Sequence, residues 1–360
     1  MSRVLCRLIV AGLAVLAAPA WSSEELIYAV VYKGSDYRAS KAEILSIDPG
    51  SAEKQLVFSD ENTPIILLQR LYVFHFPVAG GRNLFAHATQ RGESVPFPGN
   101  ASLYELSTDG SHAFRRIAPV SGNESLGEIF VNSAGTRIGY INRLKRRQYI
   151  FIHEVATGRL LHQVDVTGTF LDCYASSIGW LPRSETLFFS LETGDEHITS
   201  EESYARAGTY TMHESGVNLT KLSDPPVREG FWPPGTARMI GVLPTGEYVF
   251  ETMQQRKHPG GEGPRTLFAV VKMVPDSERA EDIGFSPGCG LYSGVRVCYQ
   301  LSPSGKYLAA AALPVSSSAT SGDIWLKDLQ AGKDGKLLSL PTKGLQGPFL
   351  GLVGWADRQR

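Results

Sequence analysis

The two ends of the chain carry complementary parts of one repeating unit. Near the C-terminus, Gly351–Arg360 reads as one strand followed by the start of a tight turn. Near the N-terminus, Leu26–Tyr32 reads as the strand that follows this turn in each interior repeat. A linear stack of such units would leave two open strand edges, whereas a ring closes by pairing its last strand with its first. The sequence therefore predicts a closed β-propeller.

Between these ends the chain repeats one order of elements: strand, tight polar turn, strand, variable loop, strand, second tight turn and strand. The clearest copy has its strands at Val295–Leu301, Tyr307–Leu313, Asp323–Leu329 and Lys336–Leu340. Further copies start near Leu71, Asn132, Leu181 and Leu243. Alternating apolar residues, with Gly, Pro, Asn and Asp between them, indicate strands joined by tight turns. Counting the split copy once, we expect a six-bladed propeller.

The split copy also predicts how the ring closes. We expect Leu350–Trp355 to be the innermost strand of a blade whose other strands are Leu26–Tyr32, Ala42–Asp48 and Lys54–Phe58. The C-terminal strand would then pair with the N-terminal strands. No window shows the sustained periodicity and caps of a helix, so the predicted fold is all-β.

The first 20 residues have the features of a secretory signal peptide. Arg3 and Arg7 precede the apolar run Leu8–Ala18, and Ala18–Ala20 offers small residues where a signal peptidase cuts. The run is shorter than the roughly 20 residues that a membrane span needs; the alternative is a buried N-terminal helix. We therefore expect a signal peptide at 1–20, one propeller domain at 21–360, and export to the periplasm or the cell exterior.

Composition and cysteines narrow the class further. Hydrophobic content of 42% and charged content of 20% are those of an ordinary globular protein, and the net charge of −1 does not indicate nucleic acid or anionic membrane as a partner. We expect a monomer. In an oxidising compartment Cys289 and Cys298 are the natural disulfide pair because they are close in sequence. Cys173 would then remain a buried small hydrophobe, although spacing alone does not prove the pairing.

The last full repeat carries a recognisable motif. Leu301–Leu308 followed by Asp323–Leu329 resembles the repeat of TolB-like propellers, a WD-like motif of the form S-P-D-G-K followed by I-W-x-x-D-L. The other copies depart from it, since Ala134, Arg183 and Thr245 stand where the turn Asp is expected. The resemblance implies the fold and export, and it does not extend to TolB's own partners.

The two kinds of connection predict which face binds. Short stereotyped turns join strands at one end of the blades, and long dissimilar loops join them at the other. The long loops are Lys33–Lys41, Thr89–Asn100, Arg143–Gln148, Glu192–Ala207, Met253–Arg265 and Pro314–Gly322. Varied loops on a rigid scaffold are where binding residues concentrate. We therefore expect the working surface on the long-loop face, at the mouth of the central channel.

Charged segments stand out on these loops. One basic loop contains Arg143, Lys145, Arg146 and Arg147, and another contains Arg256, Lys257 and His258. The acidic segment Asp195–Glu202 lies between them in sequence. Together the basic and acidic segments are candidates for a bipolar rim that docks a charged protein partner. The alternative is that they are solvated loop tips with no specific role.

A second set of candidates lies near the innermost strands. These residues are Arg70, Glu128, Asp172, Arg238 and Arg296. Facing a water-filled channel, they could hold a small anionic ligand, because Arg suits carboxylate and phosphate. The alternative is that they line a wet channel or pair with each other.

Signals for catalysis are weak. The sequence has no G-x-S-x-G, H-E-x-x-H or C-x-x-C motif, so we predict no catalytic residues, no metal and no cofactor. The predicted function is an exported, non-catalytic propeller that binds a protein partner through its long-loop face. The alternatives are a propeller enzyme, either a lyase or a hydrolase, and a small-ligand or glycan sensor with its site at the channel mouth.

Overall fold

The computed structural model of the 360-residue chain describes residues 25–33, 41–68, 78–79, 83–92, 100–121, 126–144, 147–166, 173–193, 207–222, 237–257, 264–275, 277, 279–285, 295–314, 321–341 and 349–357. All helix or strand structure in these ranges is β-strand, as the sequence predicts. None of the described segments forms a helix long and apolar enough to cross a lipid bilayer.

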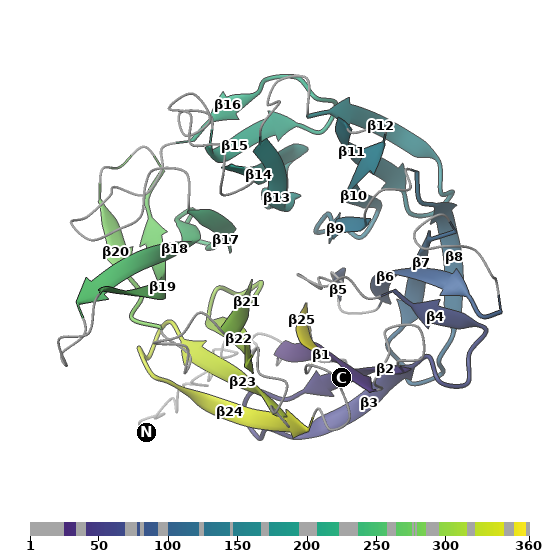
Figure 1. Cartoon of the computed structure of the whole chain (residues 1–360), viewed down its shortest axis with the longest axis horizontal. Coiled ribbons are helices and arrows are strands. Elements are labelled where there is room, and N and C mark those ends of the chain that lie inside the picture. The colour runs from purple at the N-terminus through teal and green to yellow at the C-terminus, as the bar shows by residue number, and fades with distance from the viewer. Residues whose placement is uncertain are drawn as a thin grey trace, which may run out of the picture.

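The strands form six sheets that stand like blades around a common centre (Figure 1). Blade 1 contains β25 (Phe349–Asp357), β1 (Glu25–Lys33), β2 (Lys41–Ile47) and β3 (Lys54–Ser59). Blade 2 contains β4 (Ile65–Leu67), β5 (Val78–Ala79), β6 (Asn83–Gln90), β7 (Ser102–Ser107) and β8 (Phe114–Pro119). Blade 3 contains β9 (Leu126–Val131), β10 (Arg137–Leu144), β11 (Arg147–Glu154) and β12 (Leu160–Asp165).

The other three blades follow the same plan. Blade 4 contains β13 (Cys173–Trp180), β14 (Thr186–Thr193), β15 (Gly208–His213) and β16 (Thr220–Lys221). Blade 5 contains β17 (Arg238–Val242), β18 (Tyr248–Lys257), β19 (Pro264–Met273) and β20 (Ala280–Asp282). Blade 6 contains β21 (Val295–Leu301), β22 (Tyr307–Pro314), β23 (Ser321–Asp328) and β24 (Asp334–Pro341). The predicted six-bladed all-β propeller is confirmed.

Blade 1 is assembled from both ends of the chain. β25 pairs with β1 antiparallel, from Glu25 opposite Asp357 to Tyr32 opposite Phe349. Figure 1 shows β25, in yellow, beside β1, in purple. This pairing occupies a strand edge that each end would otherwise leave open, which is the hazard that ring closure removes.

Side chains fasten this junction to blade 6. The indole of Trp355 is buried and stacks on the ring of Tyr307, with centroids 5.8 Å apart and planes 6° from parallel. Its N–H donates to the carbonyl of Gln300 at 3.0 Å. The buried carboxylate of Glu25 accepts hydrogen bonds from the backbone N–H of Ser304 at 2.8 Å and from its hydroxyl at 2.6 Å.

The core lies between the blades. Each of the six apolar clusters combines residues of two neighbouring blades. Between blades 6 and 1, for example, Ile27 and Val31 pack with Ala309 and Ile324. Because a neighbour covers each face of a blade, central strands such as β6 and β10 bury consecutive residues instead of alternate ones.

The links between strands alternate between two faces of the ring. Neighbouring strands in each blade are antiparallel, so turns from the first to the second strand and from the third to the fourth share one face, here called the turn face. Hydrogen bonds close these turns, such as Gly135 N–H to Asn132 C=O and Gly305 N–H to Ser302 C=O, both 2.9 Å. The remaining links lie on the opposite face, here called the loop face.

Two of the predicted loops on the loop face are largely strand. β10 continues through Arg143 and β11 starts at Arg147, and β18 continues through Arg256 to Lys257 while β19 starts at Pro264. The prediction that these cations lie in loops is therefore wrong for the four described basic residues. The prediction placed the end of each strand where the alternation of apolar residues stops. In the structure, backbone hydrogen bonds continue the pairing of the strands through the polar residues that follow.

Candidate functional site

Three neighbouring inner strands bring polar groups together at the centre of the ring. Arg238 is the first residue of β17, Glu128 lies on β9 and Ser177 lies on β13. The Nε–H of Arg238 donates to the hydroxyl of Ser177 at 2.9 Å, and its guanidinium lies 3.6 Å from the Glu128 carboxylate. Glu251, opposite Arg238 in the β17–β18 register, lies 4.0 Å from the same guanidinium. We call these four residues the channel cluster.

The backbone of β13 is irregular where it contributes to this cluster. The register of β13 against β14 shifts between Ser176 and Gly179, and Ser177 has a φ of 48°. Bulges of this kind redirect side chains, and a left-handed non-glycine residue costs about 1–3 kcal/mol unless its surroundings hold it. The following residue, Ile178, donates its N–H to Glu128 at 3.3 Å. The bulge thus fixes both a hydroxyl and an N–H toward the cluster.

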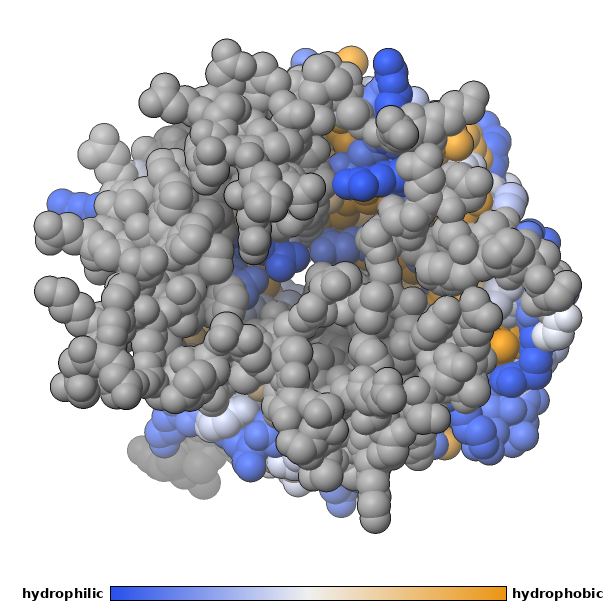
Figure 2. Space-filling view, viewed as in Figure 1, coloured by the Kyte–Doolittle hydropathy of each residue, from blue (hydrophilic) through white to orange (hydrophobic). Residues whose placement is uncertain are grey.

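The channel cluster combines one guanidinium with two carboxylates. The Arg238 side chain is 31% exposed, whereas those of Glu128 and Glu251 are 11% and 12% exposed. Figure 2 shows an opening at the centre of the ring, where the coloured residues at the edge are mostly hydrophilic. Glu128 and Arg238 pair with each other, as in the alternative to the predicted anion site, and the binding role of the set stays a prediction. The cluster can orient a small polar ligand through both charge signs.

The basic residues on the loop face come from two blades. Arg143 and Arg147 lie near the ends of the β10–β11 hairpin, both exposed, and Arg147 pairs with Asp165 at 2.9 Å. Arg256 and Lys257 lie at the end of β18 in the β18–β19 hairpin. Both hairpins join the second and third strands of a blade, so both open on the loop face.

The remaining predicted site residues either lie outside the described residues or are placed only by their strand. Arg70, Arg146, Asp172, His258 and Cys289 lie outside the described residues. Arg296 and Cys298 lie on β21, the innermost strand of blade 6, opposite Leu313 and Ala311. The Cys289–Cys298 disulfide stays a prediction. Within the described part of the chain, no group of three or more His, Cys, Asp or Glu could hold a metal ion.

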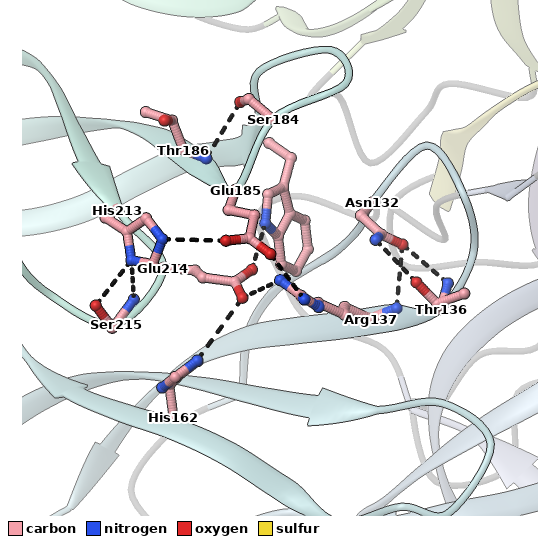
Figure 3. A network of polar contacts seen from close by, with 11 residues as sticks. Asn132, Thr136, Arg137, His162, Ser184, Glu185, Thr186, His213, Glu214 and Ser215 are labelled. Carbon is pink, nitrogen blue, oxygen red and sulfur yellow. Dashed lines mark hydrogen bonds and ion pairs between the residues drawn. The ribbon is translucent and has the colours of Figure 1, made fainter.

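A second polar network lies on the turn face between blades 3 and 4 (Figure 3). Arg137 of blade 3 lies between two carboxylates of blade 4, pairing with Glu185 at 2.9 Å and with the buried Glu214. Glu214 also accepts the indole N–H of Trp180 at 3.0 Å and lies 3.7 Å from His162 of blade 3. The hydrogen bond to Glu214 raises the pKa of Arg137 further. This network ties the two blades together.

Sequence reasoning did not find this network or the role of Ser177. Arg137 and Glu214 are far apart in the chain, and each follows an apolar or turn segment with no distinctive motif. The sequence signal that could have pointed to them is their position: Glu185 directly precedes β14 and Glu214 directly follows β15, both at the turn face. Only the ring geometry brings them together.

Comparisons with solved structures agree on the architecture. TolB from Acinetobacter baumannii superimposes with a TM-score of 0.54 at 11% identity, over 92% of this chain and 67% of that one. A protein from Bacteroides fragilis provisionally assigned as a 6-phosphogluconolactonase gives 0.51 at 11% identity, over 93% and 100%. A chain of a nidogen–laminin complex gives 0.50 at 13% identity, over 92% and 97%.

The chain has the TolB-like six-bladed propeller fold. No family model matches the sequence, and no characterised protein matches it by sequence. At these identities the likeness concerns the fold. Function has to come from the residues that the propeller displays.

Proposed function

We propose that this protein is an exported propeller whose loop face docks an acidic protein partner without catalysing a reaction on it. The observation that carries the proposal is the placement of the basic hairpin ends of blades 3 and 5 on one face. Arg143 and Arg147 belong to one hairpin, and Arg256 and Lys257 belong to the other. Charges arranged on one face favour association with a surface of opposite sign.

Two further observations support this function. The first 20 residues have the pattern of a secretory leader, which is the basis for proposing export. The fold is shared with a chain solved as part of a nidogen–laminin complex, so this architecture can serve in a complex between proteins.

The channel cluster favours a second candidate, a small polar ligand held at the centre of the ring. Ser177, Arg238 and Glu128 converge there from three blades, and the bulge in β13 places Ser177 beside Arg238. A ligand at this site would depend on Arg238 and would be insensitive to charges at the hairpin ends. Variants of the two sites therefore separate the two candidates.

The docking proposal is tested with a fourfold charge reversal. The variant carries Arg143→Glu, Arg147→Glu, Arg256→Glu and Lys257→Glu. Arg143 and Arg147 are exposed, and surface substitutions usually change stability by no more than about 0.5 kcal/mol each. Circular dichroism checks that the fourfold variant is folded. The matched control reverses two exposed lysines on the turn face, Lys54→Glu and Lys333→Glu.

The assay first recovers a partner with the parent protein and then measures the binding affinity of the purified partner. Partners recovered from the exported fraction are purified, and their affinity is compared by calorimetry at low and high salt. We expect binding to be lost in the fourfold variant, kept in the control, and weakened by salt, because exposed charges are screened beyond about 8–10 Å. Equal affinity of the parent and the fourfold variant would contradict the docking role, and loss on Arg238→Met alone would favour the channel ligand.

A further inference from the structure

A serine, a histidine and a glutamate form a hydrogen-bonded series on the turn face. The Ser215 hydroxyl lies 2.8 Å from Nδ1 of His213, and Nε2 of His213 lies 3.3 Å from Oε2 of Glu185 (Figure 3). The turn that follows β15 creates this arrangement. Its hydrogen bond from Gly216 N–H to His213 C=O, with Gly216 at a φ of 89°, folds Ser215 back over the imidazole.

The backbone determines which nitrogen of His213 is basic. The N–H of Ser215 also points to Nδ1, at 3.2 Å, and a backbone N–H can only donate. Nδ1 therefore carries the lone pair of the neutral ring, and Nε2 carries the proton that it donates to Glu185. This is the tautomer in which an imidazole can take the proton of a serine hydroxyl while a carboxylate holds the opposite nitrogen.

The carboxylate at the end of the series stays ionised. Arg137 donates to Glu185 Oε1 at 2.9 Å while His213 contacts the other oxygen. The hydrogen bond from Arg137, followed by that from His213, lowers the pKa of Glu185. Arg137 is itself held by the buried Glu214, so Glu185 is positioned by a group that the blade junction fixes. Glu185 is therefore a positioning residue for His213.

The series is open to solvent. The side chains of His213 and Glu185 are 36% and 57% exposed, and Ser215 is exposed. Ser184 offers an internal comparison in the same network (Figure 3). Its hydroxyl donates to the carbonyl of Leu181 and accepts the N–H of Thr186, and neither partner can take its proton. The two serines share exposure and differ in having a base.

We propose that Ser215 is an acyl-accepting nucleophile, with His213 as its general base, toward small activated esters that reach the open turn face. The Ser215 oxygen forms a bond to the ester carbonyl carbon as its proton passes to Nδ1 of His213. The tetrahedral intermediate expels the alcohol, which takes the proton from Nδ1, and leaves an acylated Ser215. Water then attacks the acyl carbon, gives a proton to Nδ1, and releases the carboxylic acid as Ser215 regains its proton. This activity lies on the face opposite the proposed docking surface and does not depend on it.

The test uses the whole protein with a fluorophosphonate probe and with p-nitrophenyl acetate. Peptide mapping by mass spectrometry locates the adduct, and the labelling rate is followed against pH. We expect the probe on Ser215 and not on Ser184. His213→Asn should slow labelling by about a hundredfold, the lower end of what a positioned general base contributes. Ser215→Ala should carry no adduct at this position.

Glu185→Gln separates positioning from structure. The amide oxygen can still accept from Nε2, so a purely structural role predicts an unchanged labelling rate. We expect labelling of Ser215 to slow while Ser184 is unaffected, because the charge that stabilises the imidazolium formed during proton transfer is gone. Circular dichroism confirms that each variant is folded. Equal labelling of Ser215 and Ser184, or an unchanged rate in His213→Asn, would overturn the proposal.

Discussion

The junction between blades 6 and 1 offers the most direct test of how the ring is held closed. Trp355 is 4% exposed, stacks on Tyr307 and donates a hydrogen bond to Gln300. Truncating a buried Trp to Ala costs about 3–5 kcal/mol through lost burial and the cavity that remains. Unfolding a ring of roughly 330 residues has an entropy near 0.7 kcal/mol/K, so Trp355→Ala should lower Tm by about 4–7 °C.

Two companion variants separate the contributions to the stability lost in Trp355→Ala. Trp355→Phe keeps an aromatic ring on Tyr307 but removes the indole N–H, so it should cost about 0.5–1.5 kcal/mol for the hydrogen bond plus a smaller packing loss. Leu56→Ala changes a side chain of the same blade that is 44% exposed and should stay within about 0.5 kcal/mol of the parent. Melting is followed by far-ultraviolet circular dichroism at one scan rate, because fluorescence would change with the indole itself.

The order of the three variants is the critical result. We expect Trp355→Ala to melt lowest, Trp355→Phe to lie between, and Leu56→Ala to match the parent. If Trp355→Ala melted within 1 °C of the parent, about 1 kcal/mol or less, the packing of β25 on blade 6 would not hold the ring closed.

Three further predictions concern other buried or closely packed positions. Gly158→Ala should destabilise by at least about 1–2 kcal/mol in urea unfolding, because Gly158 has a φ of +71° and a Cβ there would lie 2.0 Å from the Ile117 carbonyl oxygen. Burial lowers the pKa of His153, so the folded state binds fewer protons than the unfolded state and stability should fall as pH drops below about 6.5. His153→Asn should flatten this slope in Tm measured from pH 7.5 to 5.5, and an unchanged slope would count against it. Glu214→Gln should lower the free energy of unfolding by about 1.5–3 kcal/mol, because it weakens the charged hydrogen bonds that Glu214 accepts from Trp180 and Arg137. Equal urea midpoints of the variant and the parent would contradict this.

The fold was accessible from sequence because each blade repeats one simple pattern. Tight turns such as Ser302–Gly305 have residues with specific backbone requirements, and apolar residues alternate or run together on either side of them. These signals are local, so one chain suffices to read them. The number of blades followed from counting the copies of the repeat.

Strand ends and polar networks were not accessible in the same way. β18 runs on through Gln254–Lys257 because backbone pairing does not require apolar side chains, and no hydrophobic pattern marks where such a strand stops. Arg137, Glu185 and Glu214 meet only because blades 3 and 4 adjoin. Ser177 takes a left-handed conformation that serine rarely adopts, which the sequence does not indicate. Distant pairs of this kind depend on the finished ring.

The pairing of Glu25 with Asp357 has a consequence for how the molecule can be attached or cut. β25 ends and β1 begins on the turn face, the side away from the loop face. A tag or tether fused directly before Glu25 or after Asp357 would therefore start on the side opposite the hairpins of blades 3 and 5. Since the two residues are register partners, a short linker could join them, and a circularly permuted chain opened at another loop should form the same ring.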